Sequence, residues 1–420
     1  MKRTSMTPVS ILFLDHTAKM GGGEIALLNL ISALDRARFE PVIVLASDGP
    51  LAGKLRDAGV ETHVLPLDPS VVEARKDSLG WRSLLRARQA ALCIRYAIRL
   101  ACWARRRGVR VIHANSLKAD LYGGLAGRLA GIPTLWHVRD NVDAKYLPPA
   151  VAAAFRWLAR VVPQVVVANS ESTLRVLEAS RGQSTAVVYS GTTRVVHDGW
   201  AAPAPPPAPP ELEGEMATGP IISLVGRIAP WKGQHVFLQA AARVLERFPA
   251  ARFWIIGAPL FGEHDYERSL HALADALGIA GQVMFWGFRE DVPALLERTD
   301  ILVHASTLGE PFGQVVIEGM AAGKPVIATD GGALPEIVLP GETGLLVRMG
   351  DAADMASAVA ALLTDPAWAA AMGAAGRRRV QERFTITQTA RKVEEVYDQM
   401  LARRRDPRRG KGDVENRPGA

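Results

Sequence analysis

The sequence predicts an α/β protein made of two Rossmann-like domains, each built on a doubly wound parallel sheet. Three observations predict this class. Short apolar runs alternate with longer helical segments, the runs are rich in Val, Ile and Leu, and a proline-rich segment divides the alternation into two halves. Strands that alternate with helices form parallel sheets, and strands covered on both faces read as continuous apolar runs. The length of 420 residues also exceeds what one ordinary hydrophobic core supports.

The first half contains a series of expected strands. In chain order they are Ser10–Leu14, Pro41–Ala46, Thr62–Leu65, Val109–Ala114, Thr134–Val138, Gln164–Ala168 and Ala186–Tyr189. Helices expected between them include Glu24–Leu34, Leu51–Ala58, Leu121–Ala130 and Ser172–Glu178. The apolar stretch over 151–168 is interrupted by Arg156, Arg160 and Pro163, so we expect a helix followed by a strand and not a membrane span.

The proline-rich segment Trp200–Glu215 separates the halves, because it lacks the amides needed for a helix or a central strand. The strands expected after it are Ile221–Gly226, Arg252–Gly257, Val283–Trp286, Ile301–Ala305, Pro325–Thr329 and Gly344–Val347. We therefore expect an N-terminal domain over residues 1–199, a linker over 200–218 and a C-terminal domain over 219–384. A helix over 385–403 is expected to return toward the N-terminal domain, and a basic tail over 404–420 to be disordered.

The composition is that of a globular protein, with 48% hydrophobic, 22% charged and 6% aromatic residues. Cys93 and Cys102 lie nine residues apart in one expected helix and cannot reach disulfide geometry there, so a reducing cytoplasm is expected. The apolar run from Val9 to Leu14 is too short for a signal-peptide core or a membrane span. The net charge of +7 fits nucleic acid, an anionic membrane surface or phosphorylated ligands.

The segment over 301–329 carries the clearest chemical signal. An expected strand ends at Ser306, a loop holds Glu310, and a helix begins near Gly313. Glu310 is therefore expected at the carboxyl edge of a parallel sheet, where open α/β folds bind ligands. Free amides at the helix start can bind hydroxyls or anionic oxygens, and a carboxylate beside them can grip vicinal hydroxyls. The alternative is that Glu310 is a helix-cap acid and Glu318 a solvated helix residue.

The same segment reads Glu310-Pro-Phe-Gly-Gln-Val-Val-Ile-Glu318, and this spacing of two glutamates resembles the signature of glycosyltransferase family 4, the retaining GT-B glycosyltransferases. Other segments are similar to motifs of the same family: Gly226-Arg227-Ile-Ala-Pro-Trp-Lys232-Gly233, Gly287-Phe288-Arg289-Glu-Asp-Val292 and Gly331-Gly332-Ala-Leu-Pro-Glu336-Ile337. The resemblance covers essentially the whole C-terminal domain. It implies a GT-B fold, two domains that face each other across a cleft, and a hexosyltransferase-type activity of EC class 2.4.

The resemblance also implies which residues hold a nucleotide-sugar donor. Arg227 and Lys232 are expected on the diphosphate, where cations would neutralise the charge of a leaving group; taken alone, they would equally fit two surface cations. Glu318 is expected on the ribose, Glu310 on the sugar, and the backbone near Phe288 on the base. The full expected donor set is Gly22, Gly23, Arg227, Lys232, Phe288, Arg289, Glu310, Phe312, Gly313, Gln314, Val315 and Glu318. No cofactor or metal is expected, because basic side chains and helix dipoles can replace a cation.

In the N-terminal half, a turn with three glycines, Gly21 to Gly23, follows the first expected strand and opens a helix. Glycines let backbone approach a phosphate or sugar closely, although such turns also serve ordinary packing. The turn resembles the Gly-Gly-x-Glu loop of the family. The family more often has Asn-Gly where this chain has Ser190-Gly191, and the proline-rich segment replaces the usual sequence after it, so hinge geometry is not specified.

Two histidines, His113 and His137, lie at expected strand ends, and either fits a core histidine. The resemblance matches His137 to the family histidine near the donor sugar. It is therefore expected to be catalytic together with Glu310, Arg227 and Lys232. Lys19, Arg139 and Asp140 are expected as contacts of the acceptor.

The segment from Trp81 to Arg110 contains nine arginines and no acidic residue. At helical spacing it has an arginine stripe (Arg88, Arg95, Arg99, Arg106), a neighbouring apolar stripe (Leu85, Leu92, Tyr96, Trp103) and a far side (Ile94, Ile98, Ala101). We expect the far side to pack on the sheet, and Arg88, Arg95, Arg99, Trp103 and Arg106 to rest on an anionic membrane surface. The alternative is a solvated cationic face. Nucleic acid is disfavoured as a partner, because no recognition motif accompanies the charge.

These expectations combine into one function. The chain is expected to move a hexose-type sugar from a nucleoside diphosphate, bound by the C-terminal domain, to a hydroxyl of a saccharide or lipid-linked acceptor on the N-terminal domain. The resemblance implies retention by front-face displacement, and no well-placed nucleophilic carboxylate is evident. A role in cell-surface polysaccharide or glycolipid synthesis is expected, in the cytoplasm or at the inner face of the plasma membrane. A nucleotide-sugar epimerase and a non-catalytic sugar-nucleotide-binding protein stay open as alternatives.

Overall fold

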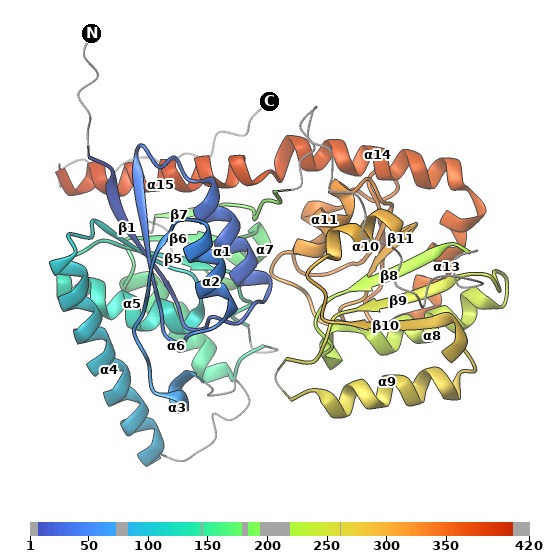
Figure 1. The fold of residues 1–420 in the computed structure, drawn as a ribbon, viewed down its shortest axis with the longest axis horizontal. Coiled ribbons are helices and arrows are strands. Elements are labelled where there is room, and N and C mark those ends of the chain that lie inside the picture. Colours follow the sequence, from blue (N-terminus) through green and yellow to red (C-terminus); the bar gives the residue numbers. More distant parts are fainter. Residues whose placement is uncertain are drawn as a thin grey trace, which may run out of the picture. The chain divides into compact units, whose positions relative to one another are not determined.

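The computed structural model describes residues 7–72, 83–143, 146–178, 184–193, 219–260 and 262–405. The chain divides into two compact units (Figure 1): unit 1 comprises Met1–Gly191 and Ile386–Ala420, and unit 2 comprises Thr192–Thr385. Each unit has one parallel sheet with helices on its faces. The predicted fold class is confirmed.

The sheet of unit 1 has the strand order β3-β2-β1-β4-β5-β6-β7, and all neighbouring strands pair in parallel. The strands are β1 (Val9–Asp15), β2 (Phe39–Leu45), β3 (Glu61–Val64), β4 (Val111–Ala114), β5 (Thr134–Val138), β6 (Val165–Ala168) and β7 (Thr185–Val187). The central strands are buried on both faces, as their runs of branched aliphatic residues require. The order reverses between β1 and β4, and doubly wound sheets bind ligands at the carboxyl ends of such a pair.

Helices cover both faces of this sheet and make two separate cores. One core lies under α4 (Ser83–Arg106), α5 (Leu117–Ala130), α6 (Pro149–Val161) and α7 (Glu171–Leu177). The other lies under α1 (Gly22–Ala33), α2 (Pro50–Asp57) and α15 (Ile386–Arg405). The last helix packs beside α1 and buries Val393, Tyr397 and Met400 in that core. A short helix, α3 (Pro69–Val72), precedes α4.

The prediction of which side of α4 is buried was wrong. Tyr96 and Leu100 are buried, with Ala97 and Ala104 beside them, and Trp103 is partly buried against the ring of His63. Ile94 and Ile98, which were expected to pack on the sheet, are 50% and 48% exposed. Alanines on this buried side let α4 lie close to α5, and the side chains of Tyr96 and Leu100 fill the core beside them. Leu92 is partly buried in the core, Ala101 is buried as expected, and the side chain of Leu85 lies outside the described residues.

The sheet of unit 2 has the order β10-β9-β8-β11-β12-β13, again all parallel. Its strands are β8 (Ile221–Val225), β9 (Arg252–Ile256), β10 (Val283–Gly287), β11 (Ile301–His304), β12 (Val326–Thr329) and β13 (Leu345–Val347). Its helices are α8 (Gln234–Leu245), α9 (His264–Ala276), α10 (Val292–Arg298), α11 (Gln314–Ala321), α12 (Leu334–Ile337), α13 (Ala352–Thr364) and α14 (Pro366–Arg383), with 3-10 turns at Pro230–Lys232 and Ala280–Gln282. The strand order reverses between β8 and β11.

Every strand expected from the sequence occurs in the described residues, with its ends within two residues of the expectation. The helix expected at Leu121–Ala130 begins earlier, at Leu117, because it follows the loop after β4 directly. The expected linker over 200–218 and the tail after Arg405 lie outside the described residues. Within the described part of the chain, no single helix is long and apolar enough to cross a bilayer; α13 and α14 pass such a test only as a pair bent by 104°.

Candidate functional site

The residues predicted to hold the donor's diphosphate and sugar meet at the carboxyl ends of β8 and β11 in unit 2. Lys232 ends the 3-10 turn after β8, and its Nζ lies 2.6 Å from Oε1 of Glu310. Glu310 follows β11 and is buried. The reversal of strand order therefore brings together two residues that are 78 positions apart in the chain.

Two further side chains bind the Glu310 carboxylate, and neither was predicted from the sequence. His304 Nε2 lies 3.0 Å from Oε1 of Glu310, and the Ser306 hydroxyl donates to the same oxygen. Thr329 Oγ1 lies 3.3 Å from Nδ1 of His304, an arrangement that leaves Nε2 to donate to the carboxylate. The signal available in the sequence was that His304 and Ser306 are polar residues at the end of the apolar run over 301–305.

The surroundings of Glu310 keep its carboxylate ionised. Burial alone would raise the pKa of Glu310, but Lys232 and His304 outweigh burial and hold the pKa well below its ordinary value. An ionised carboxylate accepts hydrogen bonds from hydroxyls, and the adjacent ammonium attracts an anion. The cluster therefore suits a ligand that carries hydroxyls next to a negative charge.

Two glycines let the loops of this cluster approach one another. Gly233 has φ 74°, and a Cβ there would lie 1.9 Å from the carbonyl oxygen of Ala305. Gly332 has φ 60°, and a Cβ there would lie 2.1 Å from the carbonyl oxygen of Glu310. Both positions combine left-handed backbone with a contact that only glycine allows. These glycines therefore hold the Lys232 and Glu310 loops close to the ends of β11 and β12.

Arg227 lies just after β8, beside Lys232. The Arg227 guanidinium carbon is 5.5 Å from the centroid of the Trp231 ring, and Lys232 Nζ is 4.5 Å from the same centroid. Arg227 Nη2 also lies 3.9 Å from Oε1 of Glu263. Both cations therefore lie near the Trp231 ring. Their binding to a single diphosphate stays a prediction.

The expected helix start after Glu310 is present. Gly313 is the N-cap of α11, and both Phe312 and Gly313 are buried. Gln314 Nε2 donates to Glu318 Oε1 at 3.4 Å, whereas the side-chain oxygen of Gln314 is buried and has no hydrogen-bond partner within the described ranges. Val315 is partly buried on the same turn. The binding of Glu318 to a ribose, and of the amides around Gly313 to a sugar, stays a prediction.

The segment predicted to meet the base follows β10. Phe288 is 58% exposed, so its ring is available for a ligand. Arg289 donates to Asp291 through Nε at 2.8 Å and Nη2 at 2.7 Å, and its guanidinium lies 5.4 Å from the Trp286 ring. These contacts orient Arg289 without defining a base pocket.

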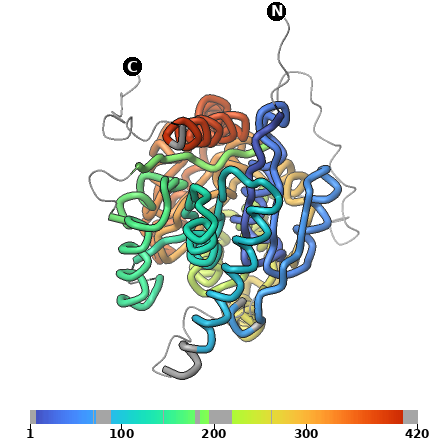
Figure 2. The backbone as a smooth tube through the Cα atoms, turned by 90° about the vertical axis from the view of Figure 1, so that its left-hand side faces the viewer, coloured from blue at the N-terminus to red at the C-terminus, as the bar shows by residue number. Residues whose placement is uncertain are grey.

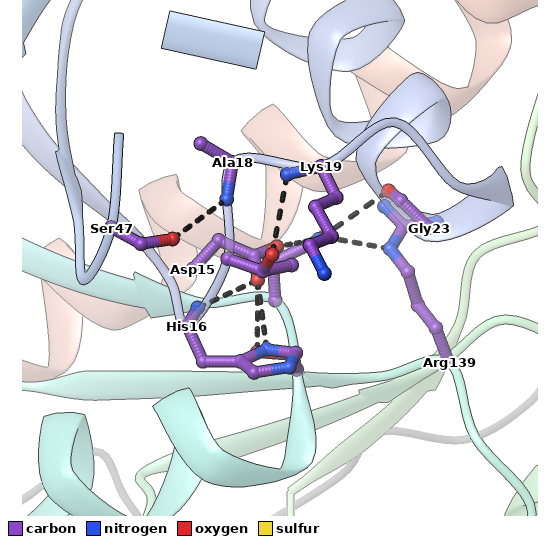
Figure 3. Close-up of polar contacts among 10 residues, drawn as sticks. Asp15, His16, Ala18, Lys19, Gly23, Ser47 and Arg139 are labelled. Atoms are coloured by element: carbon purple, nitrogen blue, oxygen red, sulfur yellow. Dashed lines mark hydrogen bonds and ion pairs between the residues drawn. The ribbon is translucent and has the colours of Figure 1, made fainter. Parts of the chain in front are cut away.

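In unit 1, polar residues gather at the corresponding reversal between β1 and β4 (Figure 3). Asp15, which was not predicted, ends β1 and is fully buried. It accepts hydrogen bonds from the His16 amide at 2.7 Å, Asn115 Nδ2 at 2.9 Å and Ser116 Oγ at 3.1 Å. Burial alone would raise the pKa of Asp15, but His16 and these hydrogen bonds lower it below its ordinary value. Asp15 is thus an ionised anchor for the loops after β1 and β4.

The turn of glycines after β1 leads into α1, with Gly21 as N-cap. A Cβ on Gly21 would lie 2.7 Å from Oε2 of Glu24, so the Glu24 side chain folds back over the turn. Burial and the neighbouring Asp15 raise the pKa of Glu24 to about 8. Of the described residues, leaving aside chain neighbours and the backbone of α1 itself, none has an atom within 4 Å of a Cβ built on Gly22 or Gly23. The turn therefore has open space at the two glycines predicted to meet the donor.

His113 and His137 lie side by side on β4 and β5 and are fully buried. His113 Nε2 lies 3.1 Å from His137 Nδ1, and His113 Nδ1 lies 2.6 Å from the hydroxyl of Tyr397. Burial, with Arg139 nearby, holds the pKa of both histidines well below the ordinary value, so both are neutral at pH 7. Among the residues that the structure describes, His137 Nε2 has no hydrogen-bond partner. Of the two histidines, His137 is the one that keeps a ring nitrogen for a ligand.

Arg139, a predicted acceptor contact, is only 9% exposed. Its Nε donates to Asn115 Oδ1 at 2.7 Å, its Nη1 to Ser190 Oγ at 2.9 Å, and its Nη2 lies 3.3 Å from His137 Nδ1. These contacts join the loops after β4, β5 and β7. They give Arg139 a structural role, and its contact with an acceptor stays a prediction.

The other two predicted acceptor contacts lie nearer the surface of unit 1. Lys19 is exposed on the turn before α1 (Figure 3). Asp140 follows β5 and accepts a hydrogen bond from the hydroxyl of Tyr146 at 2.8 Å. Their binding to an acceptor stays a prediction. The prediction of a metal-free reaction is likewise untested.

Two models of protein families match the chain. The model described as glycosyl transferase 4-like domain matches residues 21–199, and the model described as glycosyl transferases group 1 matches residues 212–379. The putative glycosyltransferase EpsD of Bacillus subtilis is 35% identical over 166 residues, which are 40% of this chain and 42% of EpsD. The chain therefore spans less than half of the length of that relative.

Two longer matches extend the similarity. The lipopolysaccharide core biosynthesis mannosyltransferase LpsB of Rhizobium meliloti is 29% identical over 289 residues, which are 64% of this chain and 80% of LpsB. The crystal structure of Anabaena HepE in complex with UDP and glucose matches with a TM-score of 0.77 and 26% identity, and it covers 92% of this chain and 99% of HepE. With one family model on each half and a GT-B structural match along the chain, the protein belongs to the glycosyl transferases group 1 family of GT-B glycosyltransferases.

Proposed function

We propose that the protein is a retaining glycosyltransferase that moves a sugar from a nucleoside-diphosphate sugar to an acceptor hydroxyl. The observation that carries this proposal is the 2.6 Å contact between Lys232 and Glu310 at the reversal between β8 and β11. Lys232 can bind a phosphate and Glu310 can accept hydrogen bonds from hydroxyls. The adjacent pair therefore suits a ligand in which a sugar is joined to a diphosphate. Anabaena HepE, whose structure holds UDP and glucose, supports a donor of this class.

The proposed reaction is a front-face displacement. The acceptor oxygen attacks the anomeric carbon on the face from which the diphosphate leaves, the bond between that carbon and the phosphate oxygen breaks, and a donor phosphate oxygen takes the acceptor proton. Arg227 and Lys232 neutralise the charge that develops on the leaving diphosphate. Glu310, ionised by its neighbours, holds sugar hydroxyls and keeps the anomeric carbon in place. The lipopolysaccharide relative supports an acceptor among cell-surface glycans or glycolipids.

A donor screen by thermal unfolding tests this function. UDP-glucose and other UDP-sugars are expected to raise the Tm more than GDP- or ADP-sugars at equal concentration, because a ligand that binds only the folded state stabilises it by mass action. At 100-fold excess over Kd the stabilisation is about 2.7 kcal/mol, enough for a Tm rise of several degrees. Equal shifts with all bases, or none, would contradict a UDP-sugar donor.

Product analysis then separates the proposed reaction from its rivals. With the stabilising donor and an acceptor mixture, the transferred sugar is expected to keep its anomeric configuration. An epimerised sugar nucleotide formed without acceptor would identify an epimerase instead, and binding without any donor turnover would identify a sensor.

We also propose that α4, α5 and α6 of unit 1 form a surface that binds anionic membranes, where a lipid-linked acceptor is presented. These helices lie side by side in the chain trace (Figure 2). Arg105 of α4 donates to backbone carbonyls of α5, and Arg128 of α5 donates to backbone carbonyls at the end of α6. Exposed apolar side chains lie on all three: Ile94, Ile98, Leu121, Leu129, Trp157 and Val161. Arg88, Arg95, Arg99 and Arg106 are exposed on α4 among them. Apolar side chains set among arginines are typical of interfacial helices, and Trp103, partly buried against His63, is no longer part of this surface.

Co-sedimentation with liposomes tests the membrane surface. Binding is expected to rise with the fraction of anionic lipid and to fall in the double variant Arg95→Glu/Arg99→Glu. Each arginine near such a surface contributes about 1 kcal/mol, so loss of two corresponds to a roughly thirtyfold weaker partition. Trp157→Ala is expected to weaken binding at every lipid charge, because it removes apolar contact.

The matched control for charge is Arg378→Glu/Arg391→Glu, which makes the same change at exposed positions on α14 and α15. This control is expected to bind as the unmodified protein does. Equal loss in both double variants, or binding that ignores anionic lipid, would sink the membrane proposal.

A further inference from the structure

A directed chain of hydrogen bonds ends at the free nitrogen of His137. It starts at the hydroxyl of Tyr397 in α15, which lies 2.6 Å from His113 Nδ1, and continues from His113 Nε2 to His137 Nδ1 at 3.1 Å. Tyr397 and His113 are 284 positions apart in the chain, and all three side chains are fully buried. The helix α15 therefore reaches the buried side chains of β4 and β5.

Arg139 decides the direction in which this chain donates. A guanidinium can only donate, and Arg139 Nη2 lies 3.3 Å from His137 Nδ1. His137 Nδ1 must therefore be the unprotonated nitrogen, which means that His113 donates to it through Nε2–H. A neutral His113 then has its lone pair on Nδ1 and accepts the Tyr397 hydroxyl. If the hydrogen bonds ran in the opposite direction, His137 Nδ1 would carry a proton that points at the N–H groups of Arg139.

We infer that Tyr397 and His113, together with Arg139, are positioning residues that hold His137 as the tautomer protonated on Nε2. Since that nitrogen has no partner in the described part of the chain, His137 offers one hydrogen-bond donor to a ligand at the carboxyl end of β5. That partner must be a hydrogen-bond acceptor on the ligand, and the effect on transfer expected from this contact rests on the proposed function. A nitrogen that carries a proton cannot also take one, so His137 is not the general base of the transfer.

The surroundings of the chain support the same protonation states. Burial raises the pKa of Tyr397 well above its ordinary value, so its hydroxyl keeps the proton that it donates. Phe13 stacks at a tilt on His113 with centroids 4.8 Å apart, and Phe39 meets Tyr397 edge to face at 5.4 Å. These contacts fix the planes of the rings. The three rings therefore have little freedom to adopt another pattern of donors.

The tautomer of His137 can be measured directly. In the full-length protein with ¹⁵N-labelled histidine rings, the His137 signals are assigned by their loss in His137→Gln. At pH 7 they are expected to show Nδ1 unprotonated and Nε2 protonated. In His113→Leu a fraction of the other tautomer is expected, because one of the two donors to Nδ1 is gone. His113→Gln, whose amide nitrogen can reach the place of Nε2, is expected to restore the original signals.

Transfer kinetics provide the second readout. Tyr397→Phe and His113→Leu are each expected to lower kcat/KM about three- to tenfold, the usual effect of one hydrogen bond, and His113→Gln to recover most of the loss. Met400→Ala is the matched control: it removes buried packing of α15 in the same core and lowers the Tm but leaves the His137 tautomer unchanged. The inference is overturned if unmodified His137 carries its proton on Nδ1, or if neither His113→Leu nor Tyr397→Phe changes the ring signals. Because the ring signals need no substrate, they decide the inference even if the protein transfers no sugar.

Discussion

Replacing Glu310 by alanine is expected to abolish sugar transfer while unit 2 stays folded. The carboxylate is the point at which Lys232, His304 and Ser306 meet, and in the proposed reaction it holds the sugar that is transferred. Loss of one preorganised polar contact in an active site typically lowers kcat by about 10²–10³-fold. Here the same change also frees Lys232 from its partner, so we expect kcat/KM to fall by roughly 10³-fold or more. Steady-state kinetics with the donor found by thermal unfolding measure this loss.

Two companion variants separate charge from structure in that experiment. Glu310→Gln keeps an oxygen that accepts hydrogen bonds but removes the charge, so it is expected to retain a small part of the activity. Glu342→Ala removes an exposed carboxylate from a turn of the same unit and is expected to leave activity unchanged. The Tm of Glu310→Ala is expected to fall modestly, by the equivalent of about 1–3 kcal/mol for the groups left without a partner. Full activity of Glu310→Ala in a folded protein would overturn the assignment.

The fold was predictable because parallel strands buried on both faces leave a plain trace in the sequence. Runs such as that of β1 are apolar over most of their length, and the helices between them fix the α/β class. Helix orientation was less predictable. The buried side of α4 includes three alanines beside Tyr96 and Leu100, whereas Ile94 and Ile98, expected on the packed side, are exposed. What decides the buried face is how closely a neighbouring helix approaches, and a single sequence does not show that distance.

The candidate site also contains some residues that could be predicted from the sequence and others that could not. Lys232 and Glu310 were predictable because each belongs to a motif with its own spacing. Their partners were not, because His304 and Ser306 look like the ordinary end of a strand until β11 places them beside Glu310. Tyr397 is the extreme case. It contributes one buried hydroxyl from the last helix, and only the packing of α15 on the first unit shows its link to His113.

Replacing Lys232 by alanine is the other change with a large expected effect. The ammonium contacts Glu310 and, in the proposed function, also binds the diphosphate, so its loss is expected to weaken leaving-group stabilisation and donor binding together. We expect kcat/KM to fall by roughly 10²–10³-fold. The Kd for UDP is expected to rise by about 10- to 150-fold, since a hydrogen bond to a charged group contributes about 1.5–3 kcal/mol. Lys232→Arg, which keeps the charge with another geometry, is expected to retain UDP binding better than transfer.

The pH dependence of the Lys232→Ala variant gives a sharper test, because Lys232 is one of the groups that lower the pKa of Glu310. Without it, burial is expected to raise that pKa, so the remaining activity should fall at a higher pH on the acid side than in the unmodified protein. The free energy of unfolding is expected to depend on pH in the same direction. A carboxyl whose pKa is lower in the folded state stabilises the fold above its unfolded pKa of about 4.3, and this contribution is lost as the pH falls toward the folded pKa. The difference in free energy of unfolding between the two proteins should therefore be largest near neutral pH and shrink in acid. A difference that is independent of pH would show that Lys232 acts through packing alone and that its pairing with Glu310 does not contribute.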